Sequence, residues 1–169
     1  SYTSPFSITA RSYYDDDLAE TILGLEVTET PGESFKYLSG NTQLLAMVLE
    51  RATGKKLADY LSESLWKPLG ANQDALWQLD SEEGGLVKAY CCIASNARDF
   101  ARLGKLYKDY GEWNGKQILD SAFVAQSITP RFEGEPYGYG FWLKDFKDKK
   151  VFMMRGHLGQ YVMVIPEDD

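Results

Sequence analysis

The feature that most restricts the fold of this chain is a change of residue pattern near position 130. Before it, apolar residues recur every three or four positions, as they do in amphipathic helices. We expect these helices over about residues 17–25, 41–53, 57–66, 97–110 and 121–129. After it, aromatic and β-branched residues typical of strands gather in segments 137–143, 151–155 and 160–165. A helical region followed by antiparallel strands predicts an α+β fold.

The length of 169 residues suits one domain, or most of one. We expect a single partial domain, with a mainly helical part at residues 1–130 and antiparallel strands of a sheet at 131–169. The last expected strand is followed only by four residues, Pro166 to Asp169, so we expect an incomplete sheet.

Local signals place several helix ends. Asp15, Asp16 and Asp17 favour the positive end of a helix. Asn41 is a plausible N-cap for the next helix, and Gly54 follows its end. We expect the apolar stripe of that helix to be formed by Leu44, Leu45, Val48 and Leu49. Asn96 and Asp99 resemble a capping box, and Ser121 is a candidate cap for a short helix.

Composition restricts the partners. The formal net charge is −7 and lysines and arginines form no dense cluster, which argues against nucleic acid. No apolar run approaches the roughly 20 residues of a membrane span, and no leader is visible. We therefore expect a small-molecule or peptide-like substrate and no membrane span in this chain. The residues indicate neither an oligomeric state nor a compartment.

The two cysteines, Cys91 and Cys92, are adjacent. Neighbouring cysteines rarely satisfy disulfide geometry, so we expect two reduced, buried side chains that act as small hydrophobes. With one histidine and no spaced Cys/His set, we expect no metal and no cofactor.

A series of short motifs begins at Tyr37-Leu38-Ser39, before the second expected helix. It continues with Ala52-Thr53-Gly54-Lys55, Pro68-Leu69-Gly70, Gly84-Gly85-Leu86, the helix at 97–104, Tyr137-Gly138-Tyr139-Gly140 and Gly156-His157-Leu158-Gly159-Gln160. Their order resembles class C β-lactamases and their penicillin-binding-protein-like relatives, among them β-lactamase-like carboxylesterases and 6-aminohexanoate-dimer hydrolases. The resemblance covers about residues 30–169.

Such proteins have three active-site elements: S-x-x-K, Y-x-N or Y-x-S, and a K-T-G or H-x-G triplet on a strand. The resemblance implies that this chain holds the second and third, and that the nucleophile lies upstream of residue 1. The chain alone should then be inactive. One S-x-x-K string, Ser64-Leu65-Trp66-Lys67, follows the tyrosine motif instead of preceding it. We interpret Leu65 and Trp66 as packing residues.

The family chemistry is attack of an activated serine on an amide, ester or lactam through an acyl-enzyme. A free tyrosine has a pKa near 10, so Tyr37 could act as a base only beside a cation such as the S-x-x-K lysine. Ser39, two residues on, could bond that lysine or the substrate amide. The structural alternatives are a tyrosine that anchors a helix start and a serine that bonds the backbone.

By the same resemblance, His157 would face the substrate, Gly159 would allow close approach, and the Gln160 N–H would be an oxyanion donor. A structural histidine is the alternative for His157. Tyr139 could contact the substrate, with core packing as its alternative. Because no lysine occupies the triplet, neutral ester or amide substrates are favoured over carboxylate-bearing penicillins.

Two other functions stay open. The chain could be a non-catalytic β-lactamase-like domain that binds a peptide or partner. A self-contained enzyme built on a serine, His157 and an aspartate is disfavoured, because no G-x-S-x-G elbow is present.

Overall fold

The computed structural model describes residue 4 and residues 7–168 and confirms the expected α+β class. The chain forms two units, one built from residues 1–63 and 75–94 and the other from residues 64–74 and 95–169. Each unit has its own apolar core. Ala46, Leu57 and Val87 form the first, and Phe141, Phe152 and Val164 form the second.

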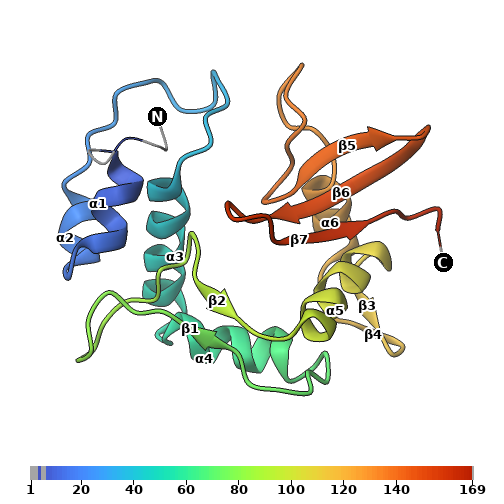
Figure 1. Cartoon of the computed structure of the whole chain (residues 1–169), viewed down its shortest axis with the longest axis horizontal. Coiled ribbons are helices and arrows are strands. Elements are labelled where there is room, and N and C mark those ends of the chain that lie inside the picture. Colours follow the sequence, from blue (N-terminus) through green and yellow to red (C-terminus); the bar gives the residue numbers. More distant parts are fainter. Residues whose placement is uncertain (1–3, 5–6, 169) are drawn as a thin grey trace. The chain divides into compact units, whose positions relative to one another are not determined.

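The first unit is mainly helical (Figure 1). Its elements are α1 (Ile8–Tyr14), α2 (Leu18–Leu23), α3 (Ser39–Thr53), α4 (Leu57–Leu61), β1 (Leu76–Trp77) and β2 (Ile93–Ala94). Asp17 caps α2 by accepting a 2.9 Å hydrogen bond from the Glu20 N–H, which confirms an acidic helix start. At the end of α4 the chain passes into a π-helical turn, Ser62–Trp66.

Helix α3 begins two residues earlier than expected. Its N-cap is Leu38, in an extended conformation, so the prediction that Asn41 caps it is wrong. The C-terminal prediction is confirmed, because Gly54 follows the helix at φ +67°. The buried side of α3 is also not the expected one: Leu44, Leu45 and Val48 are exposed by 45%, 67% and 54%.

The small or polar residues Ser39, Gly40, Gln43 and Ala46 face inward on α3 instead. The reason is a buried amide: Gln43 bonds the backbone of the segment before β2 and therefore cannot face water. Of the predicted apolar stripe, Leu49 does pack against the first core, so the prediction is right for Leu49 and wrong for Leu44, Leu45 and Val48.

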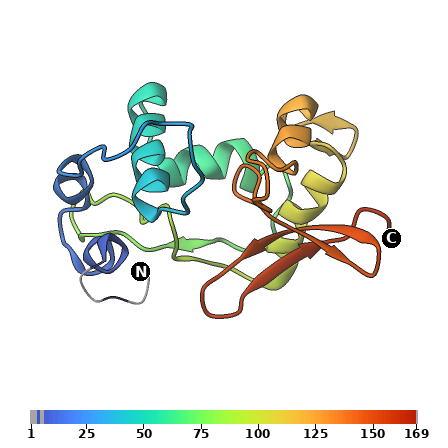
Figure 2. The ribbon, with the colours of Figure 1, turned by 90° about the horizontal axis from the view of Figure 1, so that it is seen from above.

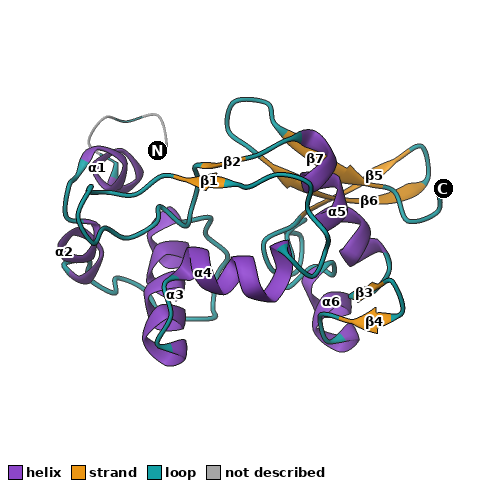
Figure 3. Ribbon diagram, turned by 90° about the horizontal axis from the view of Figure 1, so that it is seen from below, coloured by secondary structure: helices purple, strands orange, loops and turns teal. Residues whose placement is uncertain are grey.

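The segment between β1 and β2 folds back on itself. The Gln78 N–H donates to the Cys92 carbonyl at 3.1 Å, and the Lys88 N–H donates to the Gln78 carbonyl at 2.9 Å. Leu79 and Val87 form an antiparallel bridge in the same segment. Val87 in this segment is part of the first core. Most of the segment between β1 and β2 is drawn as loop in Figure 3.

Cys91 and Cys92 are joined by a disulfide. The expectation of two reduced, buried thiols is therefore wrong, since both residues are also partly exposed. Cys92 has φ +72°, a backbone region that L-residues rarely occupy and that ordinary cysteine statistics do not anticipate.

The second unit contains helices α5 (Ala97–Lys108) and α6 (Ser121–Ser127), with the hairpin β3 (Glu112–Trp113) and β4 (Lys116–Gln117) between them. The capping box of α5 is confirmed: the Asn96 side chain accepts a 2.9 Å hydrogen bond from the Asp99 N–H. Helix α6 is capped by Asp120, so the predicted Ser121 cap is wrong by one position.

An antiparallel sheet of three strands completes this unit, in the order β5 (Trp142–Phe146), β6 (Lys149–Arg155), β7 (Tyr161–Val164). The second and third strands lie where expected, whereas β5 begins five residues after the predicted start at 137. Tyr137 instead makes an isolated bridge to Trp142. Helix α5 packs against the sheet (Figure 2). None of the helices among the described residues has the length and apolar character needed to cross a bilayer.

Candidate functional site

The Tyr37-Leu38-Ser39 motif lies at the junction between an extended segment and α3. Leu38 has φ −129° and ψ 120°, and Ser39 is the first residue of the helix. The Tyr37 side chain is 43% exposed, whereas Ser39 is only 6% exposed. The Thr9 hydroxyl on α1 donates to the Ser39 Oγ at 3.4 Å. The motif therefore combines a solvent-accessible phenol with a buried hydroxyl.

An ion pair lies just before the motif. The Lys36 ammonium forms an ion pair with Glu29, and both side chains are about half exposed. The hydrogen bond from the Lys36 ammonium holds the pKa of the Glu29 carboxyl below its ordinary value, and the hydrogen bond from the Ser34 hydroxyl also lowers this pKa. This pairing links the two ends of the loop that carries Thr30-Pro31-Gly32.

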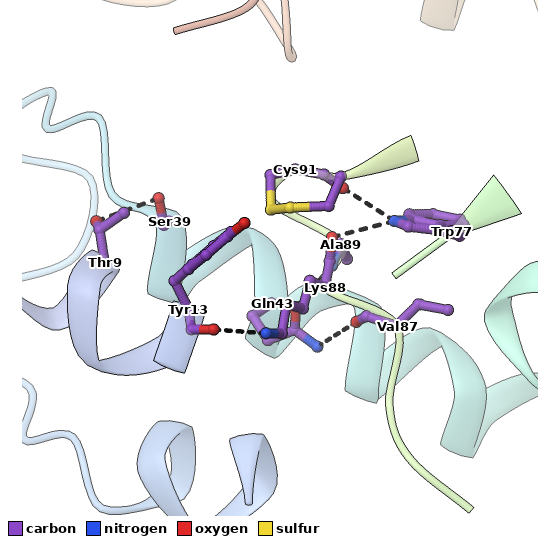
Figure 4. Close-up of a disulfide and its surroundings, with 10 residues drawn as sticks. Thr9, Tyr13, Ser39, Gln43, Trp77, Val87, Lys88, Ala89 and Cys91 are labelled. Carbon is purple, nitrogen blue, oxygen red and sulfur yellow. Dashed lines mark hydrogen bonds between the residues drawn. A yellow bond between two sulfur atoms is a disulfide. The ribbon is translucent and has the colours of Figure 1, made fainter. Parts of the chain in front are cut away.

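One turn along α3, the Gln43 side chain is 1% exposed and bonds two backbone groups. Its Nε2 donates to the Val87 carbonyl at 3.0 Å, and its Oε1 accepts from the Ala89 N–H at 2.8 Å. Figure 4 shows Gln43 between Ser39 on α3 and the segment that carries Cys91. Residues four apart on a helix share a side, so Gln43 supports the same side of α3 that buries Ser39.

Lys88 lies in this region and is 3% exposed. Its Nζ donates to the Tyr13 carbonyl at 2.6 Å and lies 4.9 Å from the centroid of the Tyr13 ring. The carbonyl and the ring compensate part of the cost of burying an ammonium group. Lys88 thereby joins the segment before β2 to the end of α1 (Figure 4).

The segment Gly156–Gln160 forms the turn between β6 and β7. This differs from the prediction that His157 begins a triplet on a strand. The Gly156 N–H donates to the Gln160 carbonyl at 2.7 Å, and Gly159 has φ +89°. The Gln160 Oε1 accepts from the Leu158 N–H at 3.0 Å. These contacts reverse the chain at Leu158, so His157 is exposed at a hairpin tip.

Tyr139 lies in the loop before β5 and is 45% exposed, so the core-packing alternative for it is wrong. Its ring stacks on Phe123 with centroids 6.2 Å apart, and the Arg131 guanidinium lies 4.7 Å from its centroid. Its role toward a substrate stays a prediction.

The Ser64-Leu65-Trp66-Lys67 string is part of the π-helical turn and the residue after it. Trp66 is 8% exposed, packs edge-on against Phe100 at 6.2 Å, and donates from Nε1 to the Gln73 carbonyl at 2.8 Å. These contacts support the packing interpretation of this string.

The structure thus places Tyr37 and Ser39 together in the first unit. It places His157, Gly159 and Gln160 together in one turn of the second unit, with Tyr139 in another loop of that unit. Gln43, which supports the buried side of α3, and Lys88, which joins the segment before β2 to α1, were missed. A polar residue four positions after Ser39 was the available signal for Gln43. Across residues 4 and 7–168, no cluster of three or more His, Cys, Asp or Glu side chains could hold a metal ion.

Comparison with known proteins agrees with the fold and with the family resemblance. The profile of the family described as Beta-lactamase matches residues 1–169. A 6-aminohexanoate-dimer hydrolase from Paenarthrobacter ureafaciens is 33% identical over 121 residues, which are 70% of this chain and 30% of the relative. Protein flp from Staphylococcus aureus (strain NCTC 8325 / PS 47) is 33% identical over 67 residues, covering 40% of this chain and 14% of that protein.

A solved structure from Bacillus anthracis, provisionally named a 6-aminohexanoate-dimer hydrolase, superposes with a TM-score of 0.76 and 28% identity. The match covers 88% of this chain and 39% of that one. The chain belongs to the β-lactamase family, a family of hydrolases, and has 6-aminohexanoate-dimer hydrolases among its homologues. It spans less than two fifths of the length of these two relatives.

Proposed function

We propose that this chain carries the Y-x-S element of a serine hydrolase that cleaves an amide or ester through an acyl-enzyme. The nucleophile would be the serine of an S-x-x-K element outside these 169 residues. The observation that carries the proposal is the Tyr37-Leu38-Ser39 junction: a phenol that solvent can reach, directly before a helix whose first hydroxyl is buried. Membership of the β-lactamase family supports it.

Tyr37 would take the proton of the nucleophilic serine during acylation and return it to the leaving group. General acid–base transfer of this kind contributes about 10²–10⁴-fold to a rate. Ser39 would fix the lysine or the substrate amide by a hydrogen bond. The Ser39 Oγ accepts a hydrogen bond from the Thr9 hydroxyl, which holds the Ser39 side chain at the start of α3.

In the second unit, the Gln160 N–H would bind the oxyanion of the tetrahedral intermediate, which in other hydrolases is worth about 3–4 kcal/mol per donor. Gly159, at φ +89°, sets the direction of that peptide group. His157 and Tyr139 would contact the substrate, since both side chains are exposed.

We propose a neutral amide as the substrate class. No lysine occupies the position of His157, so a charge partner for a substrate carboxylate is absent from that motif. Two relatives are named 6-aminohexanoate-dimer hydrolase, which supports the amide bond of this proposal and not the absence of charge on the substrate. That preference is for the full-length protein.

The proposal is tested in the full-length protein by replacing Tyr37 with phenylalanine. Turnover should fall roughly a hundredfold or more, because phenylalanine cannot transfer a proton. The matched control is Tyr110→Phe, at a tyrosine that is 54% exposed and outside the motifs, and its turnover should not change. An unchanged kcat for Tyr37→Phe would leave Tyr37 with a structural role only.

A fluorophosphonate probe provides a second test. It should label one serine of the full-length protein, in an S-x-x-K sequence, and should not label the 169-residue chain. Labelling of a serine within residues 1–169 would show that the nucleophile has been assigned to the wrong segment. A full-length protein that no such probe labels would favour the non-catalytic binding domain.

A further inference from the structure

The Cys91–Cys92 disulfide closes a small ring across one peptide bond, directly before β2. Its carbonyls are part of the hydrogen bonding of the segment. The Trp77 indole Nε1 donates to the Cys91 carbonyl at 2.9 Å and to the Lys88 carbonyl at 3.1 Å. The Cys92 carbonyl accepts from the Gln78 N–H at 3.1 Å. Both ring residues therefore take part in the hydrogen bonding between residues 77–78 and the segment that leads into β2.

The same segment holds the first turns of α3 through Gln43. Val87 and Ala89, which bond the Gln43 amide, lie two to five residues before the cysteines. Gln43 lies one turn from Ser39, and both are buried on the same side of the helix. The hydrogen bonds of Gln43 thus connect the buried side of α3, which also carries Ser39, to the segment that leads into the disulfide, all within the first unit (Figure 4).

The ring also includes an unusual backbone conformation. Cys92, which is part of this ring, has φ +72°, a backbone region in which L-residues are uncommon. A change at Cys92 alters the direction of its carbonyl and of the peptide bond to Cys91. The hydrogen bonds from Gln78 and Trp77 to these two carbonyls would then be lost or rearranged.

We propose that Cys91–Cys92 is a reversible redox-modification site whose oxidised form holds the start of α3 in place. Both cysteines are partly exposed, so a small dithiol or a dithiol protein can reach them. One reductant thiolate attacks a ring sulfur and breaks the S–S bond to give a mixed disulfide. The second reductant thiol then resolves it. Two electrons and two protons pass to the protein, which gains two thiols, and the reductant leaves as its own disulfide.

Reduction has a defined structural result. With the ring open, the 88–92 turn relaxes, the Val87 and Ala89 partners of Gln43 lose their fixed position, and the first turn of α3 opens more often. The rest of the chain should respond little, because these contacts are confined to the first unit. The inference does not depend on the proposed hydrolase activity.

The test begins with a thiol count in denaturant. The chain has two cysteines, so protein purified without reductant should show no free thiols, and the same protein treated with dithiothreitol should show two. Free thiols before reduction would overturn the proposal at this first step.

Amide hydrogen–deuterium exchange then compares the oxidised and reduced chain under native conditions. On reduction, amides in 86–94 and in 37–45 should exchange roughly fivefold faster or more, because both segments open locally. The internal control is α5, residues 97–108, which should not change. If exchange becomes faster in 86–94 and not in 37–45, the disulfide stabilises only its own segment and the proposed link to the motif is wrong.

Two variants distinguish the effect of the disulfide itself from its transmission to α3 through Gln43. The double substitution Cys91→Ser with Cys92→Ser should exchange like the reduced chain, with or without dithiothreitol. Gln43→Leu should keep the redox response of 86–94 and lose that of 37–45. A redox response of 37–45 that survives in Gln43→Leu would refute the route through Gln43.

Discussion

Replacing Gln43 with leucine tests which side of α3 is buried and what holds it. Gln43 is 1% exposed, and its amide is bonded to the Val87 carbonyl and the Ala89 N–H. Leucine fits a similar volume and cannot bond either group. Each buried backbone group left without a partner costs about 1–3 kcal/mol. The apolar leucine recovers about 1–2 kcal/mol by burial, so the net loss in free energy of unfolding has a range of about 0–5 kcal/mol, and we expect a value near its centre, about 2–3 kcal/mol.

The assay is urea denaturation followed by tryptophan fluorescence and by circular dichroism. With a slope of about 2 kcal/mol per molar urea, the midpoint should fall by about 1 M. The matched control is Leu45→Ala on the same helix, at a side chain that is 67% exposed, and its cost should stay within about 0.5 kcal/mol. The reasoning fails if Gln43→Leu is as stable as the parent chain, or if Leu45→Ala costs as much as Gln43→Leu.

Two further predictions concern pH. Hydrogen bonds hold the pKa of the Asp99 carboxyl below its ordinary value of 3.8, the largest effect being that of the Asn72 N–H, followed by Asn96, Gln73 and Arg102. The ionised carboxylate should therefore stabilise the fold fully above pH 3.8. That stabilisation should be lost as the pH falls through the lower pKa of the folded state. The thermal midpoint of Asp99→Asn should therefore be lower than that of the parent chain at pH 7, and the two midpoints should converge below pH 4. Equal midpoints at pH 7 would contradict this. Burial raises the pKa of Tyr90 to about 12, so folding favours the neutral phenol and stability should fall as pH rises from 10 toward 12. In thermal melts, Tyr90→Phe should lose less stability at alkaline pH than the parent chain. At pH 7 it should lower the free energy of unfolding by less than about 1 kcal/mol, because the buried hydroxyl has no hydrogen-bond partner among the described residues.

The parts of the fold that depend on neighbouring residues could be predicted. The capping box of α5 involves Asn96 and Asp99, three positions apart, and both residues act as the sequence indicates. Gly54 ends α3 for an equally local reason. The strands β6 and β7 follow from β-branched and aromatic content, and their register is set by a short turn.

The parts of the fold that depend on residues far apart in the sequence could not be predicted. Gln43 is drawn inward by residues 44 and 46 positions away, so helical periodicity alone assigned the wrong side of α3. The start of β5 is fixed by its pairing with β6, not by the aromatic residues that precede it. The Cys91–Cys92 ring depends on a positive φ that no residue pattern signals.

For the candidate site, the sequence identified the Tyr37-Leu38-Ser39 junction because order and spacing identify the motif. It could not supply the residues that support the junction, since Thr9 and Gln43 lie outside the three-residue motif. His157 was assigned to a strand by analogy, whereas Gly159 and the Gln160 side chain form a turn there.

The water-facing aliphatic row on α3, Leu44, Leu45 and Val48, has a practical consequence for handling this chain. Side chains of this kind attract one another between molecules, and sulfate or phosphate salts strengthen that attraction. Light scattering should therefore increase with protein concentration and with ammonium sulfate. Substituting the row with glutamate or lysine should keep the chain monodisperse without disturbing the buried side of the helix.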